Sequence, residues 1–230
     1  MKYIVYSNFG RCGSTLLSEI IGAYLYNEDY EKEKKLKPDD RSWPDPNPKY
    51  ILFADYQHQL HELERYKVIH THQINEQYHS LIKSATMCYC TRKDVVESIS
   101  SHLIAQYTKV YNHFSHTEYN SAENWKNIPT EKLTCTDEFV KGAIYSHHTL
   151  LTQYQESKQQ NPNTYLFYYE DWIGDFNSLP FTNNFKYTPN FDNFNLCKKV
   201  PVSKKEWVDY PRLIQQVNNF KNSFPQIEIQ

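Results

Sequence analysis

The chain has 230 residues and a mass of 27.5 kDa, enough for one domain with a substantial core. Its mean hydropathy of −0.78 excludes a long apolar membrane span, and the short apolar start at Ile4–Tyr6 is unlike a signal peptide. A net charge of −2 argues against general nucleic-acid binding, and 16% aromatic residues argue against disorder. We therefore expect a cytoplasmic globular protein that binds neither nucleic acid nor membrane.

The chain begins with a short apolar run, residues 2–6, that predicts a strand. A glycine-bearing turn follows, and apolar residues from Leu16 to Leu25 then recur at helical spacing. Residues 27–50 are charged and contain four prolines, which predicts a long loop. The first structural unit is thus strand, turn and helix.

Strands and helices then alternate along the chain. Strands are expected at the start of 51–66 and over 67–72, 86–91 and 165–169. Helices are expected at the end of 51–66 and over 77–83, 95–107, 137–155 and 212–220. Asp94 is placed to cap the helix that follows it. This alternation predicts one α/β domain over 1–230, a three-layer α/β/α arrangement with a central parallel sheet. Residues 109–135 form a second long loop, and the tail 183–230 wraps the core.

The spacing of the five cysteines does not indicate a chemical function. An odd number without a C-x-x-C pair argues against a disulfide framework and against a structural zinc site. Cys88 and Cys90 lie in an apolar run, where a free cysteine behaves as a small buried hydrophobe. The thiols therefore indicate a reducing compartment.

The strongest chemical signal is the turn between the first strand and the first helix. It consists of Gly10, Arg11, Cys12, Gly13, Ser14 and Thr15. Such a turn directs backbone N–H groups and the positive end of a helix dipole at one point, and this favours a bound anion. Arg11 would add a positive charge, and the two hydroxyls would add donors. The alternative is an ordinary strand-to-helix turn.

The turn differs from two known anion-binding loops. A nucleoside-triphosphatase loop requires Lys after its last glycine, where this chain has Ser14, and Asn8 stands where the first glycine belongs. The phosphatase pattern C-x5-R fails because Ser18 occupies the arginine position.

A second cluster begins at the end of the buried strand 86–91. Arg92 lies at the sheet edge where parallel α/β proteins bind ligands, and Ser100 lies two turns into the next helix. Together they can converge on a second anion. The alternative is a solvated charge cluster at a helix start.

The two clusters together resemble the sulfotransferases that use 3′-phosphoadenosine-5′-phosphosulfate (PAPS). The family's 5′-phosphosulfate loop reads P-[KR]-S-G-[ST]-T, and its 3′-phosphate motif has Arg and Ser at the spacing of Arg92 and Ser100. Residues 167–171 resemble the family's Y-E-D segment. Gly10 and Cys12 depart from the usual Pro and Ser. The resemblance covers most of residues 1–175.

The resemblance implies a P-loop-like sulfotransferase fold with PAPS as donor and no required metal. Arg11 and the loop would hold the 5′-phosphosulfate, and Arg11 would also be catalytic, because it neutralises the bridging oxygen and the departing 5′-phosphate. Arg92 and Ser100 would bind the 3′-phosphate, and Tyr169 would lie near the adenine. The family's basic C-terminal segment, which closes on the 3′-phosphate, has a loose counterpart in Lys204 and Lys205, or in residues 198–199.

His72 matches the histidine of the family's K-T-H segment, which implies that it is the catalytic base. The alternatives are a hydrogen-bonded histidine at a strand end and an H-x-H metal pair of His70 with His72. Glu19 and Asp55 are weaker candidates for the base.

The resulting expectation is sulfuryl transfer to a hydroxyl or amine of a small-molecule, carbohydrate or peptide acceptor. A nucleotide or small-metabolite kinase and a non-catalytic nucleotide-binding protein are the alternatives.

Overall fold

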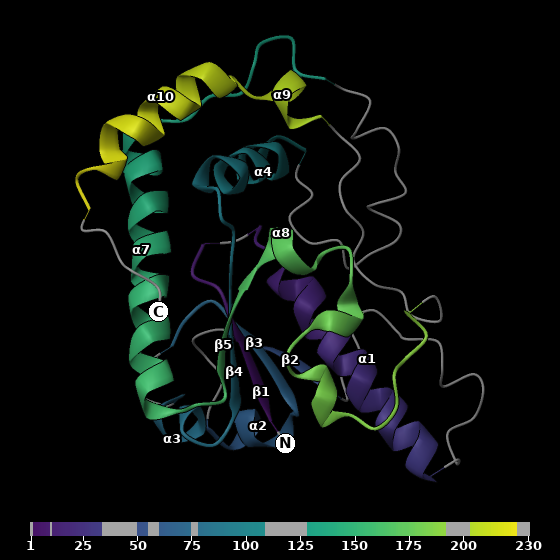
Figure 1. The fold of residues 1–230 in the computed structure, drawn as a ribbon. Coiled ribbons are helices and arrows are strands. Elements are labelled where there is room, and N and C mark those ends of the chain that lie inside the picture. The colour runs from purple at the N-terminus through teal and green to yellow at the C-terminus, as the bar shows by residue number, and fades with distance from the viewer. Residues whose placement is uncertain are drawn as a thin grey trace.

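The centre of the molecule is a sheet of five parallel strands (Figure 1). The computed structural model describes residues 2–9, 11–33, 50–54, 60–74, 78–108, 128–191 and 203–224. The strands, in spatial order, are β2 (Ile51–Ala54), β3 (Val68–Thr71), β1 (Tyr3–Tyr6), β4 (Thr86–Thr91) and β5 (Thr164–Tyr168). The predicted α/β fold with a central parallel sheet is confirmed.

The strand order defines where a ligand can enter. Tyr3 of β1 aligns with Val68 of β3 on one side and with Thr86 of β4 on the other. After β1 the chain crosses to β2 at one edge, whereas after β4 it crosses to β5 at the other edge. The connections thus diverge between β1 and β4, and parallel sheets bind ligands in the crevice at the carboxyl ends of such a strand pair.

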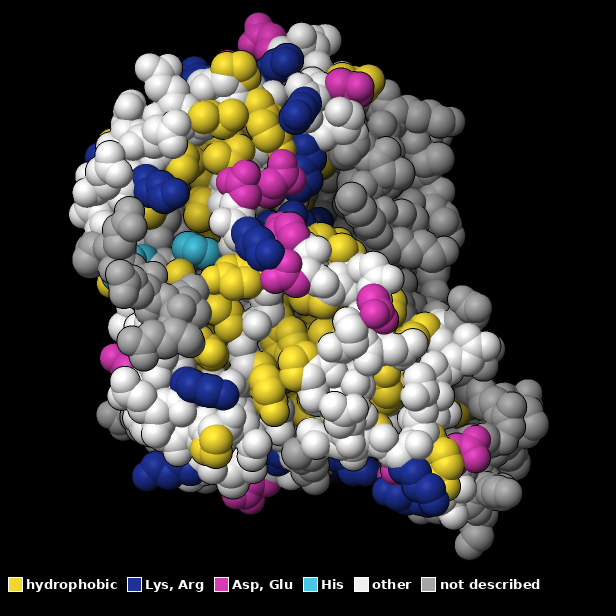
Figure 2. Space-filling model, in the orientation of Figure 1, with side chains coloured by type: hydrophobic (Ala, Val, Ile, Leu, Met, Phe, Trp, Pro, Cys, Tyr) yellow, Lys and Arg dark blue, Asp and Glu magenta, His cyan; other side chains and the backbone are white. Residues whose placement is uncertain are grey.

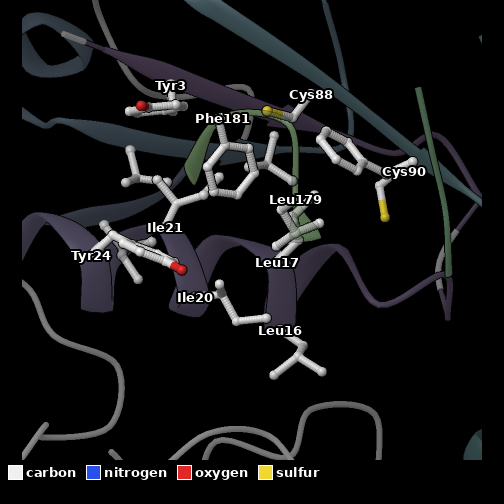
Figure 3. Packing of buried hydrophobic residues seen from close by; sticks show 14 of the residues in the cluster. Tyr3, Leu16, Leu17, Ile20, Ile21, Tyr24, Cys88, Cys90, Leu179 and Phe181 are labelled. Atoms are coloured by element: carbon white, nitrogen blue, oxygen red, sulfur yellow. The ribbon is translucent and has the colours of Figure 1, made fainter. Parts of the chain in front are cut away.

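Helices cover both faces of the sheet because alternate strand residues face opposite ways. On one face, α1 (Ser14–Glu33) packs Leu17, Ile20 and Ile21 toward Tyr3 and Phe181, as Figure 3 shows. Phe181 belongs to the segment that follows α8 (Tyr169–Trp172) and contains η3 (Phe176–Ser178) and η4 (Thr182–Asn184). The first face thus has a mixed aliphatic and aromatic core.

The other face is covered by α7 (Asp137–Gln160) together with α2 (Leu60–Arg65) and α3 (His79–Ile82). Leu150 and Tyr154 of α7 pack with Tyr6 and Tyr89 from the sheet. The Tyr89 hydroxyl forms a 2.5 Å hydrogen bond with Ser157 of α7. This contact fixes α7 against β4.

A third core joins helices beyond the carboxyl ends of the strands. It contains α4 (Val95–Thr108), α9 (Lys204–Trp207), α10 (Tyr210–Lys221) and part of α7. Figure 1 shows α4 above the strand ends and α10 over the end of α7. Asp94 caps α4 as predicted, because its Oδ1 accepts a 2.8 Å hydrogen bond from the Val96 N–H. The tail therefore packs over the end of the sheet where the candidate site lies.

Several boundaries differ from the sequence prediction, and α7, for example, ends at Gln160 rather than at residue 155. α1 continues to Glu33, so residues 27–33 are helical rather than part of the loop expected over 27–50. Glu28 explains the extension, since it accepts a 2.9 Å hydrogen bond from the Tyr187 N–H and pairs with Lys32 one turn on. α10 begins at Tyr210 rather than at residue 212 because Asp209 caps it. The rest of the first expected loop, 34–49, and residues 109–127 of the second lie outside the described residues.

Of the described cysteines, Cys12, Cys88 and Cys90 are buried free thiols, and Cys135 is a partly buried one. Cys197 lies outside the described residues. No helix in the described ranges combines the length and apolar character needed to cross a bilayer.

Candidate functional site

The loop between β1 and α1 has an unusual backbone conformation. Arg11 has a φ of 73° and Gly13 a φ of 81°, both in the left-handed region. A non-glycine residue there is strained, and such strain concentrates at ligand-binding sites. Gly10 lies outside the described residues.

Gly13 could not be replaced by a larger residue in this arrangement. A Cβ on Gly13 would lie 2.3 Å from Cδ2 of Tyr169, far inside van der Waals contact. The Tyr169 ring therefore packs directly on the loop backbone. This close approach explains why glycine is required immediately before α1.

The start of α1 offers backbone donors. The first hydrogen bond of its ladder runs from Leu17 N–H to the Gly13 carbonyl at 2.9 Å, so the N–H groups of Ser14, Thr15 and Leu16 precede the ladder. Of these, the Ser14 N–H already donates to the Cys12 thiol, which leaves Thr15 and Leu16 as the donors for an anion. With the dipole of a 20-residue helix, these groups favour negative charge at this point. The geometry suits an anion.

The pKa of the Cys12 thiol is lowered, so negative charge is favoured on the Cys12 sulfur as well. Hydrogen bonding to Cys90 is the largest influence on its pKa, and hydrogen bonds from Ser7 and Ser14 act in the same direction. Together they outweigh burial and lower the pKa of Cys12 to about 6. Cys12 is only 1% exposed, so its side chain packs in the core beneath the loop and does not contact a ligand.

Arg92 follows β4 and lies against the loop. Its Nε donates a 2.8 Å hydrogen bond to the Arg11 carbonyl, and its guanidinium lies 4.4 Å from the centre of the Tyr169 ring. One of its terminal nitrogens pairs with Glu170 at 3.3 Å. Figure 2 shows acidic and basic side chains side by side over α8, where Lys93 also pairs with Asp171.

The charges of Arg11 and Arg92 act on the same ring. Burial raises the pKa of the Tyr169 phenol, and both arginines oppose that rise. Arg11 also helps burial to lower the pKa of His102 on α4. The two arginines are also neighbours in space, because the Arg92 side chain donates its hydrogen bond to the Arg11 carbonyl.

Ser100 lies near this cluster but is fully buried. Its Oγ donates a 2.7 Å hydrogen bond to the Val96 carbonyl within α4. One turn earlier, Glu97 accepts hydrogen bonds from Lys204 Nζ at 2.7 Å and from the Tyr210 hydroxyl at 2.5 Å. Lys204 therefore anchors the tail to α4, whereas Lys205 is exposed.

His72 has a defined tautomer. Its Nδ1 lies 2.7 Å from the carbonyl oxygen of Ser7, which can only accept, so Nδ1 carries the proton. The neutral ring then has its lone pair on Nε2, the nitrogen directed away from this contact. Nε2 is therefore the ring nitrogen of His72 that a ligand at the carboxyl end of β3 would contact.

His70 has a different environment from His72. Ser7 Oγ donates to Ser14 Oγ at 3.0 Å, and Ser14 Oγ lies 2.9 Å from Nε2 of His70. Burial first, and the neighbouring His72 second, lower the pKa of His70 to about 3. The Ser14 hydroxyl is thus engaged with interior groups, and its side chain supports the loop from inside.

A metal site receives no support from the described residues. The rings of His70 and His72 lie 4.9 Å apart in a T-shaped arrangement, but no group of three or more potential ligands is found in the described part of the chain. Glu19 is buried in α1, and Asp55 lies outside the described residues.

Sequence reasoning missed three groups at this site. Glu170 pairs with Arg92, His102 stacks on Phe9 at 5.6 Å, and Trp172 packs beside Tyr169. Only Glu170 and Trp172 had a usable signal, since both fall within or next to the Y-E-D-like segment. His102 lies on the inner face of α4 and carried no motif.

Comparisons with known proteins find only a distant structural likeness. No protein-family model and no curated protein sequence matches the chain. Among solved structures, the crystal structure of retinol dehydratase in complex with androsterone and the inactive cofactor PAP matches with 17% identity and a TM-score of 0.38. The match covers 96% of this chain and 67% of that chain. Such a low TM-score carries no conclusion about ligands, so function has to be inferred from the site.

Proposed function

We propose that the protein is a PAPS-dependent sulfotransferase. The observation that carries this proposal is the contact between Arg11 and Arg92, which follow two different strands. Arg92 Nε donates a 2.8 Å hydrogen bond to the Arg11 carbonyl, and the Arg92 guanidinium lies over the Tyr169 ring. One lies at the N-terminus of α1 and the other at the end of β4, on either side of the crevice. Two neighbouring cationic positions suit a nucleotide that carries phosphate at both its 5′ and 3′ positions.

The donors present match the groups such a nucleotide offers. The first N–H groups of α1 and Arg11 would bind the 5′-phosphosulfate. Arg92 would bind the 3′-phosphate, exchanging part of its contact with Glu170 for a doubly charged group. We assign Ser100 and Lys204 to the same phosphate, which requires a local rearrangement because Ser100 is buried and Lys204 is paired with Glu97. The Tyr169 ring, in contact with both halves, would orient the nucleoside.

The chemistry assigned to the chain is positioning, charge stabilisation and proton acceptance. A bond forms between the acceptor oxygen or nitrogen and sulfur while the bond from sulfur to the bridging oxygen breaks. The electron pair stays on the 5′-phosphate, where Arg11 and the α1 N–H groups stabilise the added charge. Nε2 of His72 takes the acceptor's proton.

The acceptor belongs to one of three classes: a small molecule, a carbohydrate or a peptide. His72, which would face it, is held at the end of β3. The acceptor's hydroxyl or amine must therefore approach from the β3 side of the crevice, opposite to Tyr169.

A transfer assay tests the proposal. The full chain is incubated with sulfate-labelled PAPS and a panel of sugars, phenols, alcohols and peptides, and we expect label in at least one acceptor. Calorimetry with the product nucleotide 3′-phosphoadenosine-5′-phosphate, PAP, should show tighter binding than AMP. Phosphorylation from ATP without transfer from PAPS would indicate a kinase instead. PAP binding without transfer to any acceptor would indicate a non-catalytic nucleotide-binding protein.

A further inference from the structure

Trp172 has a buried donor without an acceptor. The side chain is 3% exposed, and its indole Nε1 finds no hydrogen-bond partner in the parts of the chain that the structure describes. Such groups are rare in native proteins, because a buried unsatisfied donor costs its full desolvation penalty. The position of this N–H therefore calls for a physical reason.

The indole is held firmly by its neighbours. The Tyr169 ring packs edge-on against it, with 5.6 Å between the ring centroids, and the Phe176 ring packs with its centroid 6.3 Å away. A phenylalanine would fill most of this space without burying a polar group. Packing alone thus explains an aromatic ring at position 172 but not a tryptophan.

Part of the Trp172 indole lies beside the loop that precedes α1. Cζ2 of Trp172 lies 3.2 Å from the position a Cβ on Gly13 would take. Cζ2 and Nε1 are both bonded to Cε2, and their hydrogens leave the same edge of the ring. Nε1 therefore lies within two bonds of the indole atom that approaches Gly13, directly before α1.

We propose that the Trp172 indole N–H donates a hydrogen bond to the anionic group bound at the N-terminus of α1. The acceptor atom is a phosphate or phosphosulfate oxygen, and the indole adds a side-chain donor to the backbone N–H groups. The inference rests on the proposed function in taking this group to be the 5′ end of the nucleotide. It makes Trp172 a binding residue rather than a part of the core alone.

The test compares Trp172→Phe with Phe176→Leu. The first change removes the donor and keeps a ring, whereas the second changes packing against the same indole and removes no polar group. Each full-length variant is titrated by calorimetry with PAP and with inorganic pyrophosphate, and its thermal unfolding is recorded without ligand. We expect Trp172→Phe to weaken both ligands about 10- to 100-fold, the loss typical of a hydrogen bond to a charged group.

The apo protein should respond in the opposite sense. Removing an unsatisfied donor leaves the unfolding temperature of Trp172→Phe equal to or above that of the wild type, whereas Phe176→Leu lowers it without changing affinity. The indole N–H resonance of Trp172 in the wild type should shift on addition of pyrophosphate, which provides a readout without any variant.

The outcomes separate this inference from the proposed function. Unchanged affinity of Trp172→Phe for pyrophosphate, with an unmoved indole resonance, would overturn the inference even if sulfuryl transfer is observed. A wild type that binds pyrophosphate through Trp172 but prefers ATP to PAP would retain the inference and reject the sulfotransferase. A wild type that binds neither PAP nor pyrophosphate would overturn both.

Discussion

Tyr169 occupies a central position in the candidate site. Its ring packs against the Gly13 backbone, where a Cβ would otherwise lie, and it also contacts the Arg92 guanidinium. A cation over an aromatic face is stabilised by about 0.5–2 kcal/mol, depending on its exposure. The ring thereby connects the loop after β1 to the end of β4. We expect a substitution of either arginine to change the packing of this ring.

The Gly13→Ala variant tests this close packing. An alanine Cβ would overlap the Tyr169 ring, and it would also strain the left-handed backbone. We expect the free energy of unfolding to fall by about 1–3 kcal/mol and PAP binding to weaken strongly. Urea unfolding and calorimetry measure the two effects. Gly142→Ala on α7, where no atom lies near the added Cβ, is the matched control. Wild-type stability of Gly13→Ala would contradict the described packing.

His70 makes stability depend on pH. In the unfolded chain a histidine binds a proton below about pH 6.5, whereas burial keeps folded His70 neutral down to a pKa of about 3. Stability from this residue is therefore complete above the unfolded pKa and is lost as the pH falls toward the folded pKa. Between neutral pH and about pH 5 the loss is about 2 kcal/mol.

The comparison with His70→Gln isolates that contribution. Urea unfolding of both proteins at neutral pH and in mild acid gives the pH dependence of each. The variant should lose less stability than the wild type on acidification, whatever its stability at neutral pH. An equal loss in both proteins would show that His70 is not the group responsible.

His72 is the residue whose replacement should affect rate without affecting nucleotide binding. Because its Nε2 lone pair would accept the acceptor's proton, we expect His72→Gln to slow sulfuryl transfer about 10²- to 10⁴-fold. The affinity for PAP should stay the same. His148→Gln, on α7 beside Phe224, serves as the control. Transfer by His72→Gln at the wild-type rate would remove His72 from the mechanism.

At the level of elements, α9 and α10 are attached to α4 through Glu97. Its carboxylate accepts from Lys204 and Tyr210, and these contacts hold its pKa below the usual range although burial acts to raise it. The charge of Arg92 also lowers the pKa of Glu97. The tail is therefore part of the structure that surrounds the proposed 3′-phosphate position.

Tyr210→Phe tests this attachment. The variant removes a hydrogen bond to a charged group, and we expect a loss of about 1–2 kcal/mol in the free energy of unfolding. Amide hydrogen exchange should become faster in α9 and α10 and stay unchanged in the sheet. Tyr165→Phe on β5 is the control. Unchanged exchange in α10 would show that other contacts attach the tail.

The elements also show what a sequence can and cannot predict. The run 86–91 identified β4 because a strand buried on both faces must be apolar throughout. The end of α1 was missed because residues 27–33 have no apolar periodicity, and their helix depends on Glu28 contacting backbone far along the chain. Local pattern cannot reveal a contact of that kind.

Some residues of the candidate site can likewise be predicted from the sequence, and others cannot. Arg11, Gly13 and Arg92 stood out because loop glycines and strand-end arginines follow from parallel-sheet topology. Trp172 did not, since its role depends on an unsatisfied N–H that only three-dimensional packing makes visible. The two arginine positions and the tautomer of His72 likewise needed coordinates before they could be related to one another.

At the scale of the whole molecule, strand order 2-3-1-4-5 places the ends of β1 and β4 side by side. The first fixes Arg11 and the α1 donors, and the second fixes Arg92. The ends of these two strands thus bring two arginines together, since the Arg92 side chain donates to the Arg11 carbonyl. The central claim is that these positions bind opposite ends of one nucleotide.

Calorimetric titration of three proteins with two nucleotides tests that claim most directly. Arg92→Ala should weaken PAP by about 1.5–3 kcal/mol and leave AMP, which lacks the 3′-phosphate, unchanged. Arg11→Ala should weaken both nucleotides, because both carry the 5′-phosphate. Equal effects of Arg92→Ala on PAP and AMP, or no effect on either, would contradict the account.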